Sequence, residues 1–524
     1  MHTRLRSLLA AVLVATVSAA NAQEITIALS APVSALDPHF HNLGPNNQVS
    51  KHVFETLVKA DEQQNLKPGL AESWKTLDDT TWEWKLRRNV RWHDGSEFTA
   101  DDVIATFKRV PAVPNSPASF GIYTRAVTEI TAPDKYTLRM KTARPHPLLP
   151  NDLISIHIVP KAVAESAKTE DFNAGKAMIG TGPYKWVEYV AGDRVVFAAN
   201  DKYWGPKPHY QKVRLRMITN AAARVAALLA GDVHMIENVP TADYAKLSKD
   251  PRVTLSSATS NRMIYLHMDS GRERNSPFVT DKAGKPMEAN PFRDPRVRKA
   301  VSKAIDRDAI VSRVMEGQAK AAGQFLHESF FGTSKKLQPE KYDLEGAKKL
   351  LAEAGYPDGF GLTLHTPNNR YINDEKVAQA VAQYLTRAGI ATKLETMPSA
   401  VFFSRGTKLE FSFLLAGWGA ETGETSSSLR SLVATFDAKL GMGGANRGRF
   451  SDAGLDAVIQ TALATIDDTK RGLMLAAASE KAITEHMALV PLHYEVSIWG
   501  TRKGIVYKAR ADQYTLASEV KAGK

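Results

Sequence analysis

The chain of 524 residues contains no cysteine. This absence excludes disulfides, thiolate metal sites, cysteine nucleophiles and thiol redox motifs. A protein of this length buries enough apolar surface to fold without disulfides, and the length predicts two or three packed units rather than one core.

Long apolar runs are also scarce. The clearest one, Leu8–Ala20, follows Arg4 and Arg6 and ends at the small residues Ala20–Ala22, which is typical of a cleaved secretory signal. The run is too short for a membrane-spanning helix. We therefore expect residues 1–22 to be a signal peptide and the mature chain to be periplasmic, without a lipid anchor because no cysteine follows.

The charge is not segregated into a strongly basic surface. The formal net charge is +12, but lysines and arginines alternate with acids along most of the chain. The densest basic cluster, residues 292–299, contains Asp294 and opens a helical pattern, which favours a solvated helix face. We expect no nucleic-acid partner.

Catalytic signatures are missing too. The sequence has no GxSxG, HExxH or GxxxxGK[ST] motif, and the glycine-rich stretch 441–446 predicts a loop. His39 and His41 are weak metal candidates, since residues two apart share one face of a strand, but no third ligand is close in sequence. We expect a binding protein without a cofactor rather than an enzyme; an exported hydrolase or chaperone is the more distant alternative.

Strand and helix patterns alternate along the mature chain, which indicates an α/β protein. The predicted strands are Glu24–Leu29, Thr81–Leu86, Tyr136–Met140, Tyr184–Tyr189, Arg194–Ala198, Val213–Ile218, Met263–Met268, Leu362–His365, Thr392–Glu395, Phe411–Ala416 and Val490–Trp499. The predicted helices cover 47–60, a segment capped by Thr99, 221–230, 295–315, 344–354, 375–388, 455–466 and 470–487.

Several segments resemble the periplasmic peptide-binding proteins of ABC importers, a family that includes oligopeptide-, dipeptide- and nickel-binding proteins. They are Leu36-Asp37-Pro38-His39, LKPGLAESWKTLDDTTWEWKLRRNVRWHDGSEFTADDV at 66–103, IGTGPYKWVEYVAGDRVVFAANDKYWG at 179–205, DPRVRKAVSKAIDRDAI at 294–310 and YDLEGAKKLLAEAGYPDGF at 342–360. These segments span nearly the whole mature chain. They are specific for the family and much less so for the ligand.

The resemblance implies a two-lobed, clam-like α/β fold with an extra small α/β domain in the first lobe. It places lobe I at 23–48, 176–264 and 493–524, the extra subdomain at 49–175 and lobe II at 265–492. The chain is expected to cross between lobes near Asn261–Asp269 and Pro491–Glu495. Closure about such crossings traps a ligand.

Residues 414–429 read LLAGWGAETGETSSSL, a strand pattern that ends at a tryptophan and two acids. In peptide-binding members of the family, a Trp followed three residues later by Asp marks the pocket, and the Asp pairs with the ligand's α-ammonium. The resemblance therefore implies that Glu421, three residues after Trp418, has this role. Glu is longer than Asp by one methylene, about 1.5 Å, so a different ligand is an open alternative.

The same stretch has a simpler interpretation and further implied contacts. A strand end followed by a solvated helix start, with Glu424 near an N-cap, explains the acids without a ligand. In the ligand-binding interpretation, Gly417 and Gly419 let a ligand backbone approach, and Trp418 forms a wall. Glu424 is then outside direct ligand contact or on the surface.

The resemblance implies other wall residues. Asn42 and Leu43 follow the Leu36-Asp37-Pro38 segment, and Phe120 and Tyr123 follow a proline-rich loop, where core packing is an equal alternative. In the dipeptide binder, an Arg and a Tyr hold the ligand carboxylate where this chain has Asn368, Arg370 and Tyr371. We select Arg370 for this role because a guanidinium pairs with a carboxylate through two hydrogen bonds; a solvated loop arginine is the alternative.

The expected function is that of a monomeric ligand-capturing component that delivers di- to oligopeptides to an inner-membrane ABC permease. The alternative keeps the fold and changes the ligand to a metal chelate, haem, glutathione or an opine-like or sugar-derived compound.

Overall fold

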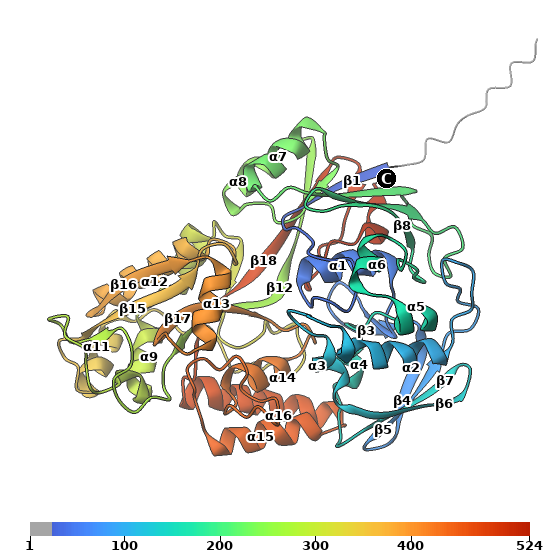
Figure 1. The fold of residues 1–524 in the computed structure, drawn as a ribbon. Coiled ribbons are helices and arrows are strands. Elements are labelled where there is room, and N and C mark those ends of the chain that lie inside the picture. Colours follow the sequence, from blue (N-terminus) through green and yellow to red (C-terminus); the bar gives the residue numbers. More distant parts are fainter. Residues whose placement is uncertain (1–23, 524) are drawn as a thin grey trace, which may run out of the picture.

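The computed structural model describes residues 24–523, which fold into two lobes joined by long strands (Figure 1). The predicted signal peptide therefore lies outside the described residues. Between residues 24 and 523, no helix has the length and apolar character needed to cross a membrane.

One mixed sheet runs through both lobes. Its strand order is β13-β15-β17-β12-β18-β11-β1-β10-β9-β8, with β14 added on β18 and β16 on β15. The bounds are β1 Glu24–Leu29, β8 Tyr184–Val190, β9 Arg194–Ala199, β10 Lys212–Met217, β11 Met235–Ile236, β12 Val253–Met268, β13 Val279–Thr280, β14 Ala319–Ala321, β15 Phe360–Pro367, β16 Ile390–Met397, β17 Phe413–Gly419 and β18 Val490–Arg502.

The first lobe contains β1, β8–β11 and four helices. These helices are α1 Gly44–Val53, α6 Thr169–Asn173, α7 Ala221–Ala230 and α8 Thr241–Leu247. The predicted helix at 221–230 is confirmed: Asn220 accepts a hydrogen bond from the amide of Ala223, and Gly231 ends the helix with a left-handed backbone (φ 91°). The C-terminal segment returns to this lobe and adds a small hairpin of β19 Ile505–Val506 and β20 Lys521–Ala522.

A smaller α/β unit packs against the first lobe. Its antiparallel sheet has the order β4-β5-β7-β6, and β2 pairs with β3 beside it. The elements are β2 Val58–Ala60, β3 Leu66–Pro68, β4 Ala71–Asp78, β5 Thr81–Leu86, α2 Ala100–Arg109, α3 Gly121–Thr124, β6 Val127–Asp134, β7 Thr137–Thr142, α4 Leu149–Asp152 and α5 Lys161–Ser166. Trp84 is fully buried at its centre and stacks on Trp74 at 5.8 Å and on Trp82 at 6.0 Å between ring centroids.

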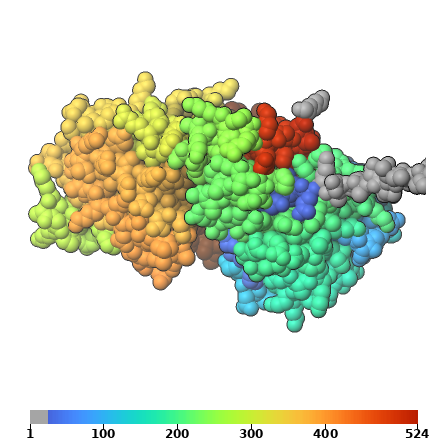
Figure 2. Space-filling view, turned by 90° about the horizontal axis from the view of Figure 1, so that it is seen from above, coloured from blue at the N-terminus to red at the C-terminus, as the bar shows by residue number. Residues whose placement is uncertain are grey.

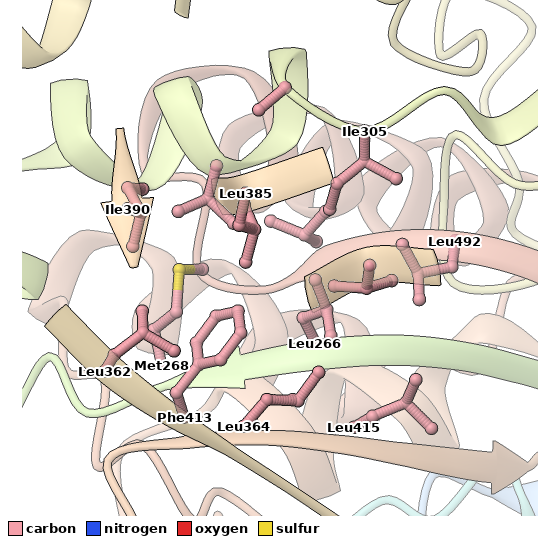
Figure 3. Packing of buried hydrophobic residues seen from close by; sticks show 14 of the residues in the cluster. Leu266, Met268, Ile305, Leu362, Leu364, Leu385, Ile390, Phe413, Leu415 and Leu492 are labelled. Carbon is pink, nitrogen blue, oxygen red and sulfur yellow. The ribbon is translucent and has the colours of Figure 1, made fainter. Parts of the chain in front are cut away.

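The second lobe covers both faces of β15, β16 and β17 with helices. One face carries the cluster in Figure 3, where Leu266 and Phe413 are completely buried, and each such side chain stabilises the fold by about 1.5–3 kcal/mol. The helices are α9 Pro295–Lys303, α10 Arg307–Ala309, α11 Leu344–Glu353, α12 Asp374–Arg387, α13 Ser399–Thr407, α14 Thr425–Ser428, α15 Ala453–Ala464 and α16 Asp468–Glu480. Seen from above in Figure 2, this yellow-to-orange lobe lies on the left and the teal part of the first lobe on the right, with the green part of the first lobe between them.

The strands β12 and β18 connect the two lobes. Their antiparallel pairing is regular up to Thr259 opposite Val496 and resumes at Met263 opposite Tyr494, so Ser260–Arg262 form an irregularity. The freed backbone and side chain of Asn261 contact other segments: its amide donates to Ala511 O at 2.9 Å and its carbonyl accepts from Ala420 N at 3.1 Å. The irregularity thus lies where the strands pass between lobes, next to the end of β17.

Two predicted helices are wrong in extent. The helix predicted over 295–315 ends at Lys303, because Asp306 has an extended backbone and caps a new short helix by accepting a hydrogen bond from Ala309 N. The helix predicted over 47–60 begins at Gly44 and ends at Val53, because Phe54 is extended (φ −108°, ψ 144°) and the chain continues into β2.

Candidate functional site

Glu421 lies just beyond the end of β17, in a turn where the amide of Gly423 donates to the carbonyl of Ala420 at 2.9 Å. Its Oε2 accepts a hydrogen bond from the hydroxyl of Tyr514 at 3.3 Å. Burial raises the pKa of Glu421, while the positive charge of Arg262 opposes this rise. A carboxylate that is shielded from water and bound to a neutral hydroxyl favours a cationic partner.

A chain of hydrogen bonds connects Glu421 to predicted first-lobe residues. Asn47 Nδ2 lies 3.4 Å from the Tyr514 hydroxyl and also donates to Asn42 Oδ1 at 3.0 Å. Asn42 Nδ2 donates to the hydroxyl of Tyr123 at 3.2 Å. Burial, helped by the negative charge of Glu421, raises the pKa of Tyr123 to about 12. The structure therefore brings three of the predicted residues, Glu421, Asn42 and Tyr123, into one network.

The glycines of β17 have tightly packed neighbours. A Cβ on Gly417 would lie 2.7 Å from Ile264 Cδ1 and 2.7 Å from Tyr371 Cε1, and one on Gly419 would lie 3.1 Å from Arg262 Nη2. These glycines therefore make room for side chains of the protein itself, and not only for the ligand backbone expected from the sequence. The Tyr371 hydroxyl also donates to Gly417 O at 3.1 Å, which fixes the ring against the strand.

Trp418 is half-buried at the same strand end. It packs on the second-lobe core and on a small cluster of Leu326, Phe330, Ala420 and Ala511. Its indole Nε1 is buried and has no hydrogen-bond acceptor among the described residues. Trp418 is thus placed by packing beside Glu421.

The loop after β15 carries Arg370 and Tyr371. The Arg370 guanidinium carbon lies 5.5 Å from the centre of the Tyr371 ring. The Arg370 side chain is exposed, but neighbouring protein partly desolvates its guanidinium. This desolvation lowers the pKa of Arg370, and the positive charge of Arg262 lowers it further. Asn368 is exposed, and its amide donates to Met397 O at 3.0 Å. Arg370 and Tyr371 thus lie on the Glu421 side of the second lobe.

Three residues near this loop were missed by the sequence analysis. Arg262 Nε donates to Gln513 Oε1 at 3.1 Å and lies 3.4 Å from Glu495 Oε2. Glu495 Oε1 accepts from the amide of Ile372 at 3.0 Å, and its Oε2 accepts from Gln513 Nε2 at 3.3 Å. A glutamate inside the otherwise uncharged run Val490–Trp499 was the signal that such a buried ionic contact exists.

A cavity of about 240 Å³ lies on the first-lobe side of Glu421. Its lining includes Asn47 and Lys51 of α1, the C-terminal residues Asp512 and Tyr514, and Glu421. Lys51 Nζ donates to Ile154 O at 3.3 Å and lies 5.4 Å from the centre of the Tyr514 ring. Burial lowers the pKa of Lys51 to about 8, although the negative charges of Asp512 and Glu421 oppose this change.

Glu424 differs from the expectation of an N-cap or a surface acid. It stands at the N-terminal boundary of α14, but its side chain makes no capping hydrogen bond. Instead it is 2% exposed and pairs with Arg471 Nη2 at 3.1 Å, with the Ser426 hydroxyl also bound to it. The second acid is therefore a buried structural ion-pair partner.

The remaining candidates lie around this site or within cores. Leu43 is 37% exposed beside Asn42, whereas Phe120 is 1% exposed and belongs to the core of the small α/β unit. His39 Nε2 lies 2.7 Å from His157 O and its Nδ1 lies 2.8 Å from Arg109 Nη1.

His41 Nδ1 lies 2.9 Å from Ser34 Oγ. Over residues 24–523, no cluster of three or more His, Asp or Glu side chains is arranged to hold a metal ion.

The sequence matches the family model described as "Bacterial extracellular solute-binding proteins, family 5 Middle" over residues 65–439. It is 27% identical to heme-binding protein A of Haemophilus influenzae, covering 81% of this chain and 78% of that protein. It is 28% identical to the glutathione-binding protein GsiB of Shigella boydii, covering 90% of this chain and 89% of that protein.

Solved structures share the fold. The periplasmic binding protein DppA of Helicobacter pylori, described as ABC transporter-associated and in complex with the peptide STSA, superposes with a TM-score of 0.79. The two chains are 24% identical, and the match covers 96% of this chain and 98% of the other. The two-lobed α/β fold and the resemblance that predicted it are both confirmed.

The family model covers well over half of the chain, and the structure has the same architecture as a solved binding protein. The chain therefore belongs to family 5 of the bacterial extracellular solute-binding proteins, the substrate-binding components of ABC importers.

Proposed function

We propose that this protein captures short peptides in the periplasm and delivers them to an inner-membrane ABC permease, acting as a monomer. The observation that carries the proposal is the partly buried carboxylate of Glu421, which has a tyrosine hydroxyl rather than a cation as its hydrogen-bond partner. The α-ammonium of a peptide would supply the missing positive charge. Because an unpaired charge is costly away from water, this contact strengthens as the lobes exclude solvent.

The second end of the ligand is assigned to Arg370 and Tyr371. A guanidinium and a phenol on one loop suit a terminal carboxylate, and Arg370 is exposed, with its guanidinium carbon 5.5 Å from the centre of the Tyr371 ring. Between the two ends, Asn42, Leu43 and Trp418 offer one amide and two apolar contacts. A peptide bound mainly through its ends and backbone is expected to show loose side-chain specificity.

Lobe closure is proposed to occur about the irregular segment Ser260–Arg262. Contacts between the lobes already meet the turn that carries Glu421. Gln64 Nε2 donates to Glu421 O at 3.1 Å, and Asn151 Nδ2 donates to Thr422 O at 2.7 Å. These bonds link closure of the small α/β unit to the position of the acid.

We also propose the division of the chain given by the resemblance. Lobe I comprises 23–48, 176–264 and 493–524, the subdomain 49–175 and lobe II 265–492. Residues 1–22 are proposed to be removed on export, which places the protein in the periplasm.

The first test is native mass spectrometry of the protein purified from its export compartment, before and after mild denaturation. Released masses that sequence as short peptides support the proposal and give the preferred length. A single non-peptide mass, such as haem or a metal chelate, contradicts the peptide function and leaves the fold assignment intact. If nothing is released, calorimetric titration with a peptide mixture decides, and absence of heat contradicts the proposal.

A further inference from the structure

A second cavity, of about 310 Å³, lies where the small α/β unit faces the second lobe. Four cations line it: Arg125 and Arg144 come from the small unit, and Arg430 and Lys439 come from the second lobe. This cavity shares no lining residue with the one beside Glu421. It is therefore a separate space, and both of its walls carry positive charge.

The cations are held at the ends of regular elements. Arg125 is the C-terminal cap residue of the short helix α3, and Arg144 comes shortly after the end of β7. Arg430 lies in the helical turn Leu429–Val433 that continues α14, and Lys439 lies in the loop that follows this turn. Two segments of each unit thus bring their charges to one place.

No acid of the protein neutralises these cations. Their side-chain nitrogens form no ion pair or hydrogen bond with another of residues 24–523. The one acid in the lining, Asp152, is buried, and its Oδ2 lies 2.8 Å from His146 Nε2. With His146 neutral, the lining has four positive charges and one negative charge, which leaves a net charge of +3.

The guanidinium of Arg125 lies close to the opposite wall. Burial lowers the pKa of Arg125, and the positive charge of Arg430 lowers it further, as does that of Arg144, while Asp152 opposes them. Arg125 Nη2 packs against Gly441 of the second lobe, where any Cβ would collide with it. Like charges gathered in this way repel each other, and an anion between them removes the repulsion.

We infer that this cavity binds a small multivalent oxyanion of the phosphate type, held by guanidinium groups from both lobes. A phosphate group carries a charge of about −1.5 to −2 at neutral pH and has several acceptor oxygens, so it suits a site with several cations better than one carboxylate does. A guanidinium binds such a group through two parallel hydrogen bonds. The cavity is much larger than the roughly 30 Å³ that one water molecule occupies, so it has room for an ion of several atoms.

The position of the cavity gives the anion a further effect. Because its ligands come from the small unit and from the second lobe, a bound anion bridges the two. It offsets the repulsion between Arg125 and Arg430, which otherwise opposes their approach when the lobes close. The anion therefore favours the arrangement in which these two surfaces are close.

The test is equilibrium dialysis of the wild-type protein against radiolabelled inorganic phosphate, without peptide and with the ionic strength held constant by sodium chloride. We expect saturable binding of one phosphate per chain. Arg125→Gln and Arg430→Gln, one from each wall, are each expected to weaken this binding at least fivefold. Arg125→Lys keeps the charge but loses the two-pronged hydrogen bonding, and an intermediate loss is expected.

Two controls separate a specific effect from a general one. Arg88→Gln removes an exposed arginine of the same unit, in the turn after β5 and outside the cavity lining, and is expected to leave phosphate binding unchanged. Arg125 is exposed and Arg430 is partly exposed, so both variants should unfold at the wild-type temperature in phosphate-free buffer. Thermal denaturation followed by circular dichroism checks this.

Three results would overturn the inference. They are absence of saturable phosphate binding by the folded wild-type protein, equal weakening by Arg88→Gln, and weakening by a variant of one wall without weakening by a variant of the other. Since no peptide is present in these measurements, each of these results leaves the proposed peptide function standing.

Discussion

Glu421 and Glu424 lie three residues apart, on either side of the turn that leads from β17 into α14, yet they have different surroundings. Glu424 pairs with Arg471 within the second lobe, whereas Glu421 contacts Tyr514, a neutral residue of the C-terminal segment. Burial raises the pKa of both acids. Glu424, which is buried and has an internal cation, is part of the structure, whereas Glu421, which is partly buried and has none, is available to a cationic ligand.

The largest effect is expected from breaking the internal pair. Arg471→Met leaves the carboxylate of Glu424 buried without its cation, and we expect the free energy of unfolding to fall by about 3–5 kcal/mol. Chemical denaturation followed by circular dichroism measures this change.

The double variant Arg471→Met/Glu424→Gln removes the unpaired charge and is expected to recover part of the loss. If Arg471→Met is as stable as wild type, the two acids do not differ in the way that the structure indicates.

The second effect concerns affinity rather than stability. Glu421→Ala removes the carboxylate expected to bind a ligand ammonium, and should weaken binding of a peptide at least tenfold, which corresponds to about 1.4 kcal/mol. The free energy of unfolding should change little because Glu421 has no cation to leave unpaired. Calorimetric titration gives the affinity, and Glu410→Ala, at a partly exposed acid elsewhere in the second lobe, serves as the control.

If Glu421→Ala binds the peptide as tightly as wild type does, Glu421 does not bind the ligand. Equal weakening by Glu410→Ala shows that the loss is not specific to the site.

The third effect is a pH dependence. Burial raises the pKa of Glu421 above its ordinary value of 4.5, and a bound ammonium favours the ionised form. The affinity for a peptide with a free amino terminus is therefore expected to be highest above the raised pKa and to fall as the pH falls through it. In the ligand-free protein the pH affects stability in the opposite direction. The folded state binds this proton more tightly than the unfolded state does, so the contribution of Glu421 to the free energy of unfolding decreases as the pH rises from the pKa of the unfolded state to the raised pKa of the folded state.

Titrations between about pH 4 and pH 8 measure this effect. In Glu421→Gln, the part of the pH dependence of affinity that arises from this carboxyl should be absent. It should also be absent when wild type binds an N-acetylated peptide. A pH profile that is identical in wild type and Glu421→Gln contradicts the assignment.

The two acids also show which features of the structure could be predicted from the sequence. The elements with clear periodicity and caps were predicted well, as in the case of helix α7, which begins after Asn220 and ends at Gly231. The alternation of strand and helix patterns, together with the segments that resemble the family, was enough to predict the two-lobed fold. Long-range ionic contacts were not predictable, because the partners of Glu424 and Arg262 are 47 and 251 residues away along the chain.

The candidate site was predictable in part for the same physical reason. Glu421 and Asn42 lie in loops, and Tyr123 lies in the short helix α3 after the proline-rich loop, so the sequence pattern around each of them indicated a candidate. Arg262 and Glu495 lie within or next to strands β12 and β18, where a single charge resembles one solvated position of an alternating strand. Only the irregular pairing near Ser260–Arg262 turns Arg262 toward Gly419, and no local sequence pattern indicates such an irregularity.

The smallest effect is expected at the contact between lobes. Asn151→Ala removes the hydrogen bond from Nδ2 to Thr422 O, which is 2.7 Å long. Since one neutral hydrogen bond contributes about 0.5–1.5 kcal/mol, we expect peptide affinity to fall by less than about tenfold. The change should appear mainly as faster dissociation, because this bond connects the small α/β unit to the Glu421 turn, and stopped-flow measurements of ligand release test this.

The control, Gln211→Ala, is at an exposed position just before β10 and should leave release unchanged. If Asn151→Ala leaves the dissociation rate unchanged, the contact does not contribute to holding the lobes closed. In that case the ionic contacts of the ligand with Glu421 and with Arg370 are enough to hold the lobes closed. The affinity then depends on Glu421 being available to the ligand, which Glu424 is not.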